Sequence, residues 1–373
     1  MNARLFHLGT ILILFAFASV GGCECGDDDD DDGGGGTALD DDTSGPDDDS
    51  TGADDDVDDD ATDDDFVDDD SGDDDTADDD TTDDDTGDDD TADDDTFDDD
   101  TADDDTADDD EDVIVDVRVL TLNIQNPLFA GDPLDDRTQV VADFINDAQP
   151  DFVALQEVTQ NLFQRNVGEV LSEKTGYDYV FRQTHYLPFL AEEGVGILSM
   201  HPIEWHDSVG LPHPEFPLLL SRAILGVRVT TEVGSFQFFG SHWTISSLPA
   251  FKADQATAAL DFIYSHPSDN PAFFAGDLNA EPDMIAMRVL RGEDVWNGKT
   301  GDLVDAWLDV HPGDPGYTHP SDDPEKRIDY IYVIPGADSS FETLSCEVVL
   351  TEEVGGTRAS DHAGVLCDFR LTI

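Results

Sequence analysis

Regularly spaced apolar residues begin at residue 113 and continue to the end of the chain. Alternation of apolar and polar residues predicts strands over 115–124, 151–156, 177–181, 194–200, 223–230, 235–241, 272–275, 328–334 and 364–371. Apolar residues three and four apart predict helices over 135–148, 161–174 and 254–264. Because strands outnumber helices, we expect an α/β fold in which two mixed β-sheets pack face to face with helices outside, a four-layer α/β/β/α sandwich.

The segment before residue 113 has a different pattern. From Asp47 to Asp110 it repeats Asp-Asp-Asp followed by Thr-Ala, Thr-Gly or a similar pair. Such a sequence cannot bury enough apolar surface to fold, and its self-repulsion favours an extended chain. We predict a disordered Asp-rich tether over 23–112 and one folded domain over 113–373. The aspartate triplets lack the spacing of calcium-binding loops, so they favour weak, diffuse cation binding over defined sites.

The first 22 residues are typical of an export signal. Arg4 precedes an apolar stretch from Leu8 to Val20, which is shorter than a typical transmembrane helix. The run from Val20 to Cys23 resembles a bacterial lipobox, in which the cysteine becomes the lipidated first residue. We expect a signal peptide over 1–22 and a lipid anchor at Cys23 that holds the protein on a bacterial membrane or cell surface. Ordinary cleavage and secretion is the alternative, and no protein partner is inferred.

The formal net charge of −75 lies mostly in the tether. Residues 27–112 hold 50 acidic residues and no basic one, whereas residues 113–373 hold 40 acidic residues against 15 Lys and Arg. Proteins normally attract nucleic acid through clustered Lys and Arg, which release counterions from the phosphates. A folded domain with this negative balance therefore needs a bound cation to meet a phosphate substrate.

Five polar residues stand at or just after the carboxyl ends of apolar runs. They are Asn123, Glu157, His242, Asp277 and Asn279. Strand ends that face one way make one site. A lone carboxylate at Glu157, directly after an apolar run, is costly to desolvate without a cation or a hydrogen-bonding partner. In an extended segment Asp277 and Asn279 point to the same face, so one can orient a water while the other holds a phosphate oxygen.

Asp361 and His362 form a further polar pair, after Gly355-Gly356. Adjacent residues of an extended segment point in opposite directions, so both can serve one cleft only if the backbone bends there. Phosphoester hydrolysis requires charge neutralisation at the phosphate and an activated water, and hard oxygen ligands suit Mg²⁺, with Mn²⁺ or Ca²⁺ as alternatives. The sequence has no cluster of histidines at zinc spacing, which disfavours zinc.

Seven segments resemble, in order, the motifs of the endonuclease/exonuclease/phosphatase superfamily. They are LTLNI at 120–124, ALQEV at 154–158, GVGILS at 194–199, GSHW at 240–243, GDLN at 276–279, RIDYI at 327–331 and SDH at 360–362. The superfamily includes deoxyribonuclease-I-like and exonuclease-III-like enzymes, bacterial sphingomyelinases and inositol polyphosphate 5-phosphatases. The resemblance covers residues 117–370 and implies a metal-dependent hydrolase of phosphoester bonds, with an extracellular nuclease or a sphingomyelinase-like phospholipase as narrower alternatives.

The resemblance also implies roles for the residues at the strand ends. Glu157 would be the main metal ligand, and Asn123 would contact the metal or the phosphate. Asp277 would position or deprotonate the attacking water, and Asn279 would stabilise the pentavalent transition state. His242 would contact the phosphoryl oxygens or assist proton transfer.

Further roles follow for residues outside those strand ends. His362 would be oriented by Asp329, a pairing that fixes the tautomer and favours the imidazolium. Asp361 would hold a second metal or the water. Arg222 and Arg327 would grip a substrate phosphate or cap strand edges, and both readings stay open.

Some positions depart from the family pattern or lack a motif. Gln125 stands where some nucleases carry a metal-binding carboxylate, and Met200 replaces a common basic residue. His242 has no evident carboxylate partner except Glu193. Six further histidines have no motif context and are expected on the surface or in loops; they are His185, His201, His206, His213, His311 and His319.

Two cysteines, Cys346 and Cys367, flank the segment that ends in Ser360-Asp361-His362. Export permits a disulfide between them, because disulfides persist outside the cytosol. Two buried free thiols remain the alternative.

A non-catalytic surface-displayed binding module with the same fold is the hypothesis of a different class. In that reading the acidic tether serves adhesion or cation capture. Every expected catalytic position holds a competent residue, which favours the enzyme.

Overall fold

The computed structural model describes residues 113–373 except 128–129, 131–132, 188–190, 214–220 and 338. The predicted signal peptide, Cys23 and the tether lie outside the described residues. The strands are β1 (Ile114–Asn123), β2 (Phe152–Gln160), β3 (Asp178–Leu187), β4 (Ala191–Ser199), β5 (Ile203–Leu211), β6 (Arg222–Thr231), β7 (Gly234–His242), β8 (Ala272–Asp277), β9 (Val304–Asp305), β10 (Asp329–Ile334), β11 (Ser340–Val349) and β12 (Gly364–Thr372). The helices are α2 (Leu134–Ala148), α3 (Val167–Thr175), α4 (Pro249–Tyr264), α5 (Ile285–Leu290) and α6 (Ala306–Val310). Among the described helices, none is long and apolar enough to cross a membrane.

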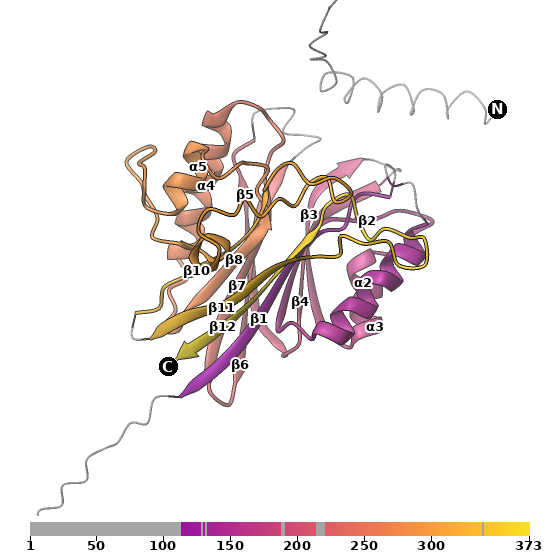
Figure 1. The fold of residues 1–373 in the computed structure, drawn as a ribbon, viewed down its shortest axis with the longest axis horizontal. Helices are drawn as coiled ribbons and strands as arrows, with labels where there is room; N and C mark the ends of the chain where they lie inside the picture. The colour runs from indigo at the N-terminus through magenta and orange to yellow at the C-terminus, as the bar shows by residue number, and fades with distance from the viewer. Residues whose placement is uncertain (1–112, 128–129, 131–132, 188–190, 214–220, 338) are drawn as a thin grey trace, which may run out of the picture. The chain divides into compact units, whose positions relative to one another are not determined.

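The strands form two six-stranded mixed sheets, in the orders β11-β12-β1-β2-β4-β3 and β5-β6-β7-β8-β10-β9. Each sheet contains one parallel pair: β1 with β2, joined through α2, and β7 with β8, joined through α4. All other pairs of named strands are antiparallel. The two crossover helices, α2 and α4, lie on opposite outer faces of the two sheets, with α3 beside α2 and α5 beside α4 (Figure 1).

Apolar side chains fill three layers, one between the sheets and one under each helical layer. Between the sheets, Phe152 of the first sheet stacks on Phe238 of the second with ring centroids 5.1 Å apart. Leu120 and Leu122 of β1 point instead toward Val141 and Ile145 of α2. Both faces of the central strands are therefore buried, and the expected four-layer α/β/β/α sandwich of mixed sheets is confirmed.

Several expectations about single elements were wrong or incomplete, and strand β9 and helices α5 and α6 were not among the expected elements. The helix expected from 161 begins at Val167, because the Asn166 side chain caps it by accepting a hydrogen bond from the Glu169 N–H at 3.2 Å. The Asn161 side chain accepts from the Phe163 N–H at 2.9 Å and holds a turn just before it. Strand β5 was not expected, because it lies at a sheet edge and most of its side chains are partly or fully exposed.

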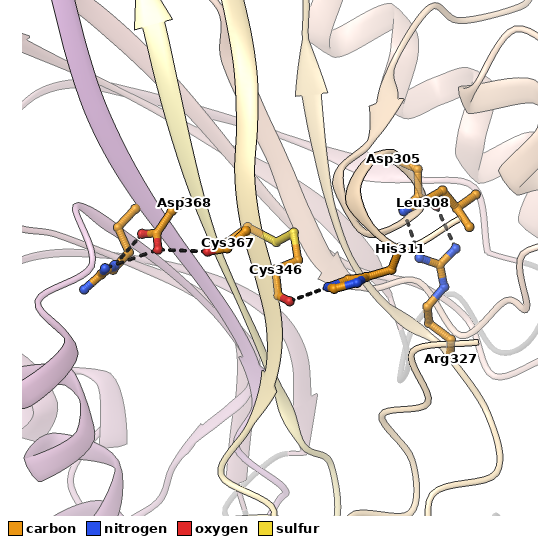
Figure 2. Close-up of a disulfide and its surroundings, with 9 residues drawn as sticks. Asp305, Leu308, His311, Arg327, Cys346, Cys367 and Asp368 are labelled. Atoms are coloured by element: carbon orange, nitrogen blue, oxygen red, sulfur yellow. Dashed lines mark hydrogen bonds and ion pairs between the residues drawn. A yellow bond between two sulfur atoms is a disulfide. The ribbon is translucent and has the colours of Figure 1, made fainter. Parts of the chain in front are cut away.

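Cys346 of β11 and Cys367 of β12 face each other in the strand register and are joined by a disulfide (Figure 2). Both residues are buried in the layer between the sheets. His311, which follows α6, contacts the Cys346 carbonyl oxygen through Nε2 at 2.8 Å. The disulfide therefore ties the two strands that flank the loop carrying Ser360 to His362.

Candidate active site

The strand ends bring four of the expected side chains to one edge of the two sheets. Asn123 ends β1, and His242 and Asp277 end β7 and β8, where they are register partners. Because β10 runs antiparallel to β8, its first residue, Asp329, lies beside Asp277. The parallel pairs and this one antiparallel neighbour thus gather polar groups from both sheets at one place.

Glu157 owes its direction to an irregularity in β2. The pairing of β2 with β4 shifts between Leu155 and Val158, and Glu157 has a positive φ of 57°. A bulge of this kind re-aims a side chain next to a site. Glu157 Oε1 accepts a hydrogen bond from Asn123 Nδ2 at 3.2 Å, and Oε2 accepts from the Asn126 N–H at 2.7 Å.

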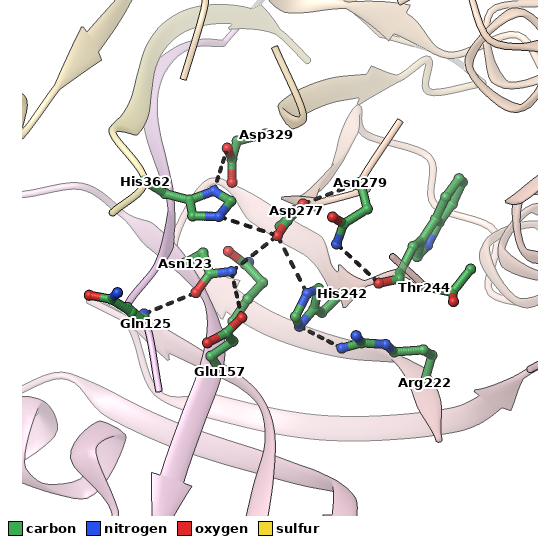
Figure 3. Close-up of polar contacts among 12 residues, drawn as sticks. Asn123, Gln125, Glu157, Arg222, His242, Thr244, Asp277, Asn279, Asp329 and His362 are labelled. Atoms are coloured by element: carbon green, nitrogen blue, oxygen red, sulfur yellow. Dashed lines mark hydrogen bonds and ion pairs between the residues drawn. The ribbon is translucent and has the colours of Figure 1, made fainter. Parts of the chain in front are cut away.

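Asp277 stands at the centre of the cluster (Figure 3). Its Oδ2 lies 3.0 Å from Asn123 Nδ2, 3.4 Å from His242 Nε2 and 3.8 Å from His362 Nε2. Burial alone would raise the pKa of Asp277, but the charge on His362 and the contacts with His242 and Asn123 hold that pKa well below its usual range. The carboxylate is therefore ionised and is available as an acceptor.

His362 forms a buried pair with Asp329. Its Nδ1 lies 2.9 Å from Asp329 Oδ2, which also accepts from the Thr318 hydroxyl at 2.6 Å. Burial would lower the pKa of His362, but Asp329, Asp277 and Asp361 raise it to about 10. The ring is therefore an imidazolium at neutral pH, as the resemblance implied.

Asn279 is placed by backbone and side-chain contacts together. Its backbone N–H donates to Asp277 Oδ1 at 2.9 Å, and its φ is 48°. Its Nδ2 donates to the Trp243 carbonyl oxygen at 3.2 Å. The buried Lys252 of α4 donates to the Asn279 carbonyl oxygen, so the helix side of the second sheet supports this residue.

The backbone bends at 361–362, as the adjacent pair required. The Ser360 hydroxyl donates to the Asn123 carbonyl oxygen at 2.5 Å and accepts from the His362 N–H at 3.1 Å, which ties the loop to the end of β1. The Asp361 carboxylate lies 3.3 Å from the Ser360 hydroxyl.

The two candidate arginines have different surroundings. Arg222 lies in the cluster, with NH1 2.8 Å from His242 Nδ1. Arg327 instead directs NH1 and NH2 to Asp305 at 2.9 and 2.8 Å and is almost fully buried (Figure 2). Of the two readings left open for Arg327, these contacts favour the structural one: NH1 and NH2 pair with Asp305, and the guanidinium lies over the Tyr330 ring.

Some neighbours of the site were not foreseen. Glu193 faces His185 at 3.3 Å and not His242, and the buried position of His185 contradicts a surface location. The His319 ring lies 4.5 Å from that of His362. Lys252 had a signal in the sequence, because it falls on the buried stripe of α4 with Ala256, where a charged residue is out of place.

Two groups of residues offer ligand atoms for a cation. Ligand atoms of Asp277, Asp329 and His362 lie within 4.8 Å of one another. His362 already directs Nδ1 to Asp329, and its positive charge disfavours a cation there. Glu157 fits better, because no ion pair of the described residues involves it and it accepts hydrogen bonds from the neutral Asn123 side-chain amide and the Asn126 N–H.

Such a site in a two-sheet sandwich defines the class of metal-dependent phosphoesterases. The chain belongs to the endonuclease/exonuclease/phosphatase family, whose model matches residues 120–362. Members of this family hydrolyse phosphoester bonds with the help of divalent metals. No curated protein matches the chain.

Solved structures share the fold. An endonuclease/exonuclease/phosphatase from Beutenbergia cavernae is 25% identical, with a TM-score of 0.54, over 69% of this chain and 72% of that chain. The human Nocturnin catalytic domain with bound sulfate is 19% identical, with a TM-score of 0.53, over 69% and 97%. D. rerio TDP2 complexed with a single-strand DNA product is 18% identical, with a TM-score of 0.54, over 68% and 98%.

Proposed function

We propose that the protein is an exported hydrolase of phosphoester bonds that uses Mg²⁺ bound at Glu157 and Asn123. The observation that carries this proposal is the position of Asp277 Oδ2, on which Asn123, His242 and His362 converge within 3.8 Å. A bound cation would neutralise charge on the phosphate oxygens. Mn²⁺ and Ca²⁺ are alternatives, since both also prefer oxygen ligands.

Three side chains of the cluster can activate the water, bind a phosphoryl oxygen and stabilise charge in the transition state. Asp277 is ionised and can orient the attacking water or accept its proton. Asn279 uses one N–H of its amide for the Trp243 carbonyl, which leaves the second N–H for a phosphoryl oxygen. His362 carries a positive charge and can stabilise negative charge that develops in the transition state.

The loops at this edge of the sheets favour a small phosphoester over a nucleic acid. Their exposed acidic residues are Glu281, Asp283, Asp322, Asp323, Glu325, Glu352 and Glu353. Arg165 is paired with Glu173, and Arg358 with Glu353. Exposed Lys326 has no ion pair within the described ranges, so little positive charge remains to hold the flanking phosphates of a polymer. A nuclease is therefore the second candidate and a sphingomyelinase-like phospholipase the third.

Export and lipid anchoring at Cys23 belong to the proposal as well. The run from Val20 to Cys23 supports them, and the disulfide between Cys346 and Cys367 is consistent with an oxidising compartment. The acidic tether over 23–112 would hold the enzyme away from the membrane. Mass spectrometry of the mature amino terminus tests this: a diacylglyceryl group on Cys23 supports the anchor, and an unmodified terminus at any other residue contradicts it.

A substrate panel tests the proposed activity. It comprises a chromogenic phosphodiester, a chromogenic phosphomonoester, inositol phosphates, sphingomyelin, RNA and single-stranded DNA, each with Mg²⁺ and with chelator. We expect Mg²⁺-dependent turnover of at least one small phosphoester, and we expect His362→Ala to lower it by about 10²- to 10³-fold, the usual contribution of one group that stabilises charge in the transition state. Turnover that persists in chelator, or that is equal in His362→Ala, contradicts the proposal.

A further inference from the structure

We infer that Arg222 is a positioning residue that holds His242 in the neutral tautomer with its proton on Nε2, directed at Asp277 and the reaction centre. This inference rests on the proposed function and deepens it. One sequence-based reading had Arg222 contact the substrate. In the present inference Arg222 contacts a side chain of the protein instead.

The hydrogen bond between the two side chains fixes the tautomer. Arg222 NH1 lies 2.8 Å from His242 Nδ1. A guanidinium has only donors and stays protonated in proteins, so Nδ1 must be the acceptor. An imidazole that accepts at Nδ1 carries its proton on Nε2, and that atom lies 3.4 Å from Asp277 Oδ2. The Nε2–H group therefore faces the cluster.

Arg222 is poorly placed to bind a substrate. Its exposed fraction is 8%, and its Nε is a buried donor with no partner in the described part of the chain. Burial lowers the pKa of Arg222, and the charges of Glu193, Glu157 and Asp277 offset only part of that effect. On β6, Arg222 is next to Ala223, the register partner of His242, so its guanidinium can contact the histidine of the neighbouring strand.

The two histidines of the site therefore have partners of opposite charge at Nδ1. Asp329 accepts at Nδ1 of His362, which favours a charged ring. Arg222 donates to Nδ1 of His242, which leaves a neutral ring with one directed N–H. His242 thus serves as a fixed hydrogen-bond donor to Asp277 or to a phosphoryl oxygen, and charge stabilisation falls to His362.

Nitrogen-15 NMR of the full-length protein labelled at histidine reads the tautomer directly. The His242 signals are assigned by comparison with His242→Gln. We expect wild-type His242 to be protonated at Nε2 and unprotonated at Nδ1 at pH 7.5. Protonation at Nδ1, or at both nitrogens, overturns the inference. This readout needs no turnover, so it stands apart from the proposed activity, which fails only if no phosphoester is hydrolysed.

Variants at position 222 separate positioning from substrate binding. Arg222→Met removes the donor at similar side-chain length, and Arg228→Met, at an arginine further along β6 that lies over the Trp205 ring, is the matched control. We expect Arg222→Met to give a mixed tautomer at His242 and to lower kcat by about 10- to 100-fold, as is typical when a partner that orients a site residue is lost. KM should change little, and Arg228→Met should change neither value.

The same variants also give the results that would overturn the positioning role of Arg222. A rise in KM with unchanged kcat in Arg222→Met assigns Arg222 to the substrate and overturns the inference, and so does an unchanged tautomer. Arg222→Gln keeps a neutral amide that can donate to Nδ1, and its kcat should follow the fraction of His242 protonated at Nε2. If Arg222→Met does not fold, as judged by circular dichroism, the wild-type tautomer and the Arg222→Gln comparison still decide.

Discussion

At the scale of single residues, His362 is the side chain whose charge depends most on the fold. It lies between Asp329 and Asp277, with Nδ1 and Nε2 at 2.9 and 3.8 Å from their carboxylates. Burial opposes its charge, but the carboxylates raise its pKa from 6.5 to about 10. A charged group with a raised pKa stabilises the folded state, because folding then binds a proton that the unfolded chain releases.

This shift predicts a pH dependence of stability. The contribution of His362 is fully present below pH 6.5 and is lost as the pH rises through about 10. Urea denaturation at intervals from pH 6 to pH 10 measures the free energy of unfolding of the wild type and of His362→Gln. The difference between them should shrink as the pH rises. A difference that stays constant over this range contradicts the raised pKa.

The sequence predicted residue roles where both partners belonged to motifs of the resembled superfamily. The pairing of Asp329 with His362 was expected from the resemblance and is present at 2.9 Å. Partners from unrelated segments were not predictable, because only the folded sheet brings them together. Arg327 meets Asp305 of the two-residue strand β9, and His242 meets Arg222, and neither contact leaves a local pattern in the sequence.

At the scale of elements, the close approach of β8 to β7 places Asp277. Gly276 has a φ of 153°, and a Cβ added there would lie 2.0 Å from the Ser241 carbonyl oxygen of β7. A side chain at this position would have to push the two strands apart. The glycine of the GDLN motif is therefore needed so that the last residue of β8 can reach the centre of the site.

Gly276→Ala should accordingly weaken both the fold and the activity. We expect the free energy of unfolding to fall by about 1–3 kcal/mol or more, because the clash involves backbone that cannot turn aside. Urea denaturation measures the change. Gly210→Ala of β5 is the control, since its added Cβ would come no closer than 3.9 Å to any of its neighbours. Equal stabilities of the two variants would refute this account of the strand packing.

Elements with strong periodicity were predicted well from the sequence. The expected start of the helix at 135 differs by one residue from the observed start of α2, and the central strands were all located. The start of α3 was missed because the side chains of Asn161 and Asn166 decide it, and these compete with an apolar pattern that runs through them. The bulge that turns Glu157 into the site has no signal in the periodicity at all.

At the scale of the whole molecule, charge decides which substrates can approach. The domain over 113–373 has 40 acidic residues against 15 Lys and Arg, and residues 27–112 of the tether add 50 acidic residues with no base. Screening by salt weakens repulsion between exposed charges. A polyanion and a small phosphoester should therefore respond differently to ionic strength.

We expect kcat/KM for any hydrolysis of single-stranded DNA to rise with added NaCl, and kcat/KM for a small chromogenic phosphodiester to change much less. The double variant Asp322→Lys/Asp323→Lys, at exposed positions near the site, should raise the rate on DNA more than Asp143→Lys on α2 does. Steady-state rates over a salt series measure both effects. A fall in the DNA rate with salt would mean that the domain attracts nucleic acid.

The central claim is that a divalent cation at Glu157 makes the site a phosphoesterase. The most direct measurement is a titration of chelator-treated protein with Mg²⁺, with the initial rate on a chromogenic phosphoester as the readout. It is carried out on the wild type, on Glu157→Gln and on the control Glu192→Gln of β4. We expect saturable activation of the wild type and the control and no activation of Glu157→Gln at the same concentrations. Equal Mg²⁺ activation of all three proteins would contradict the claim.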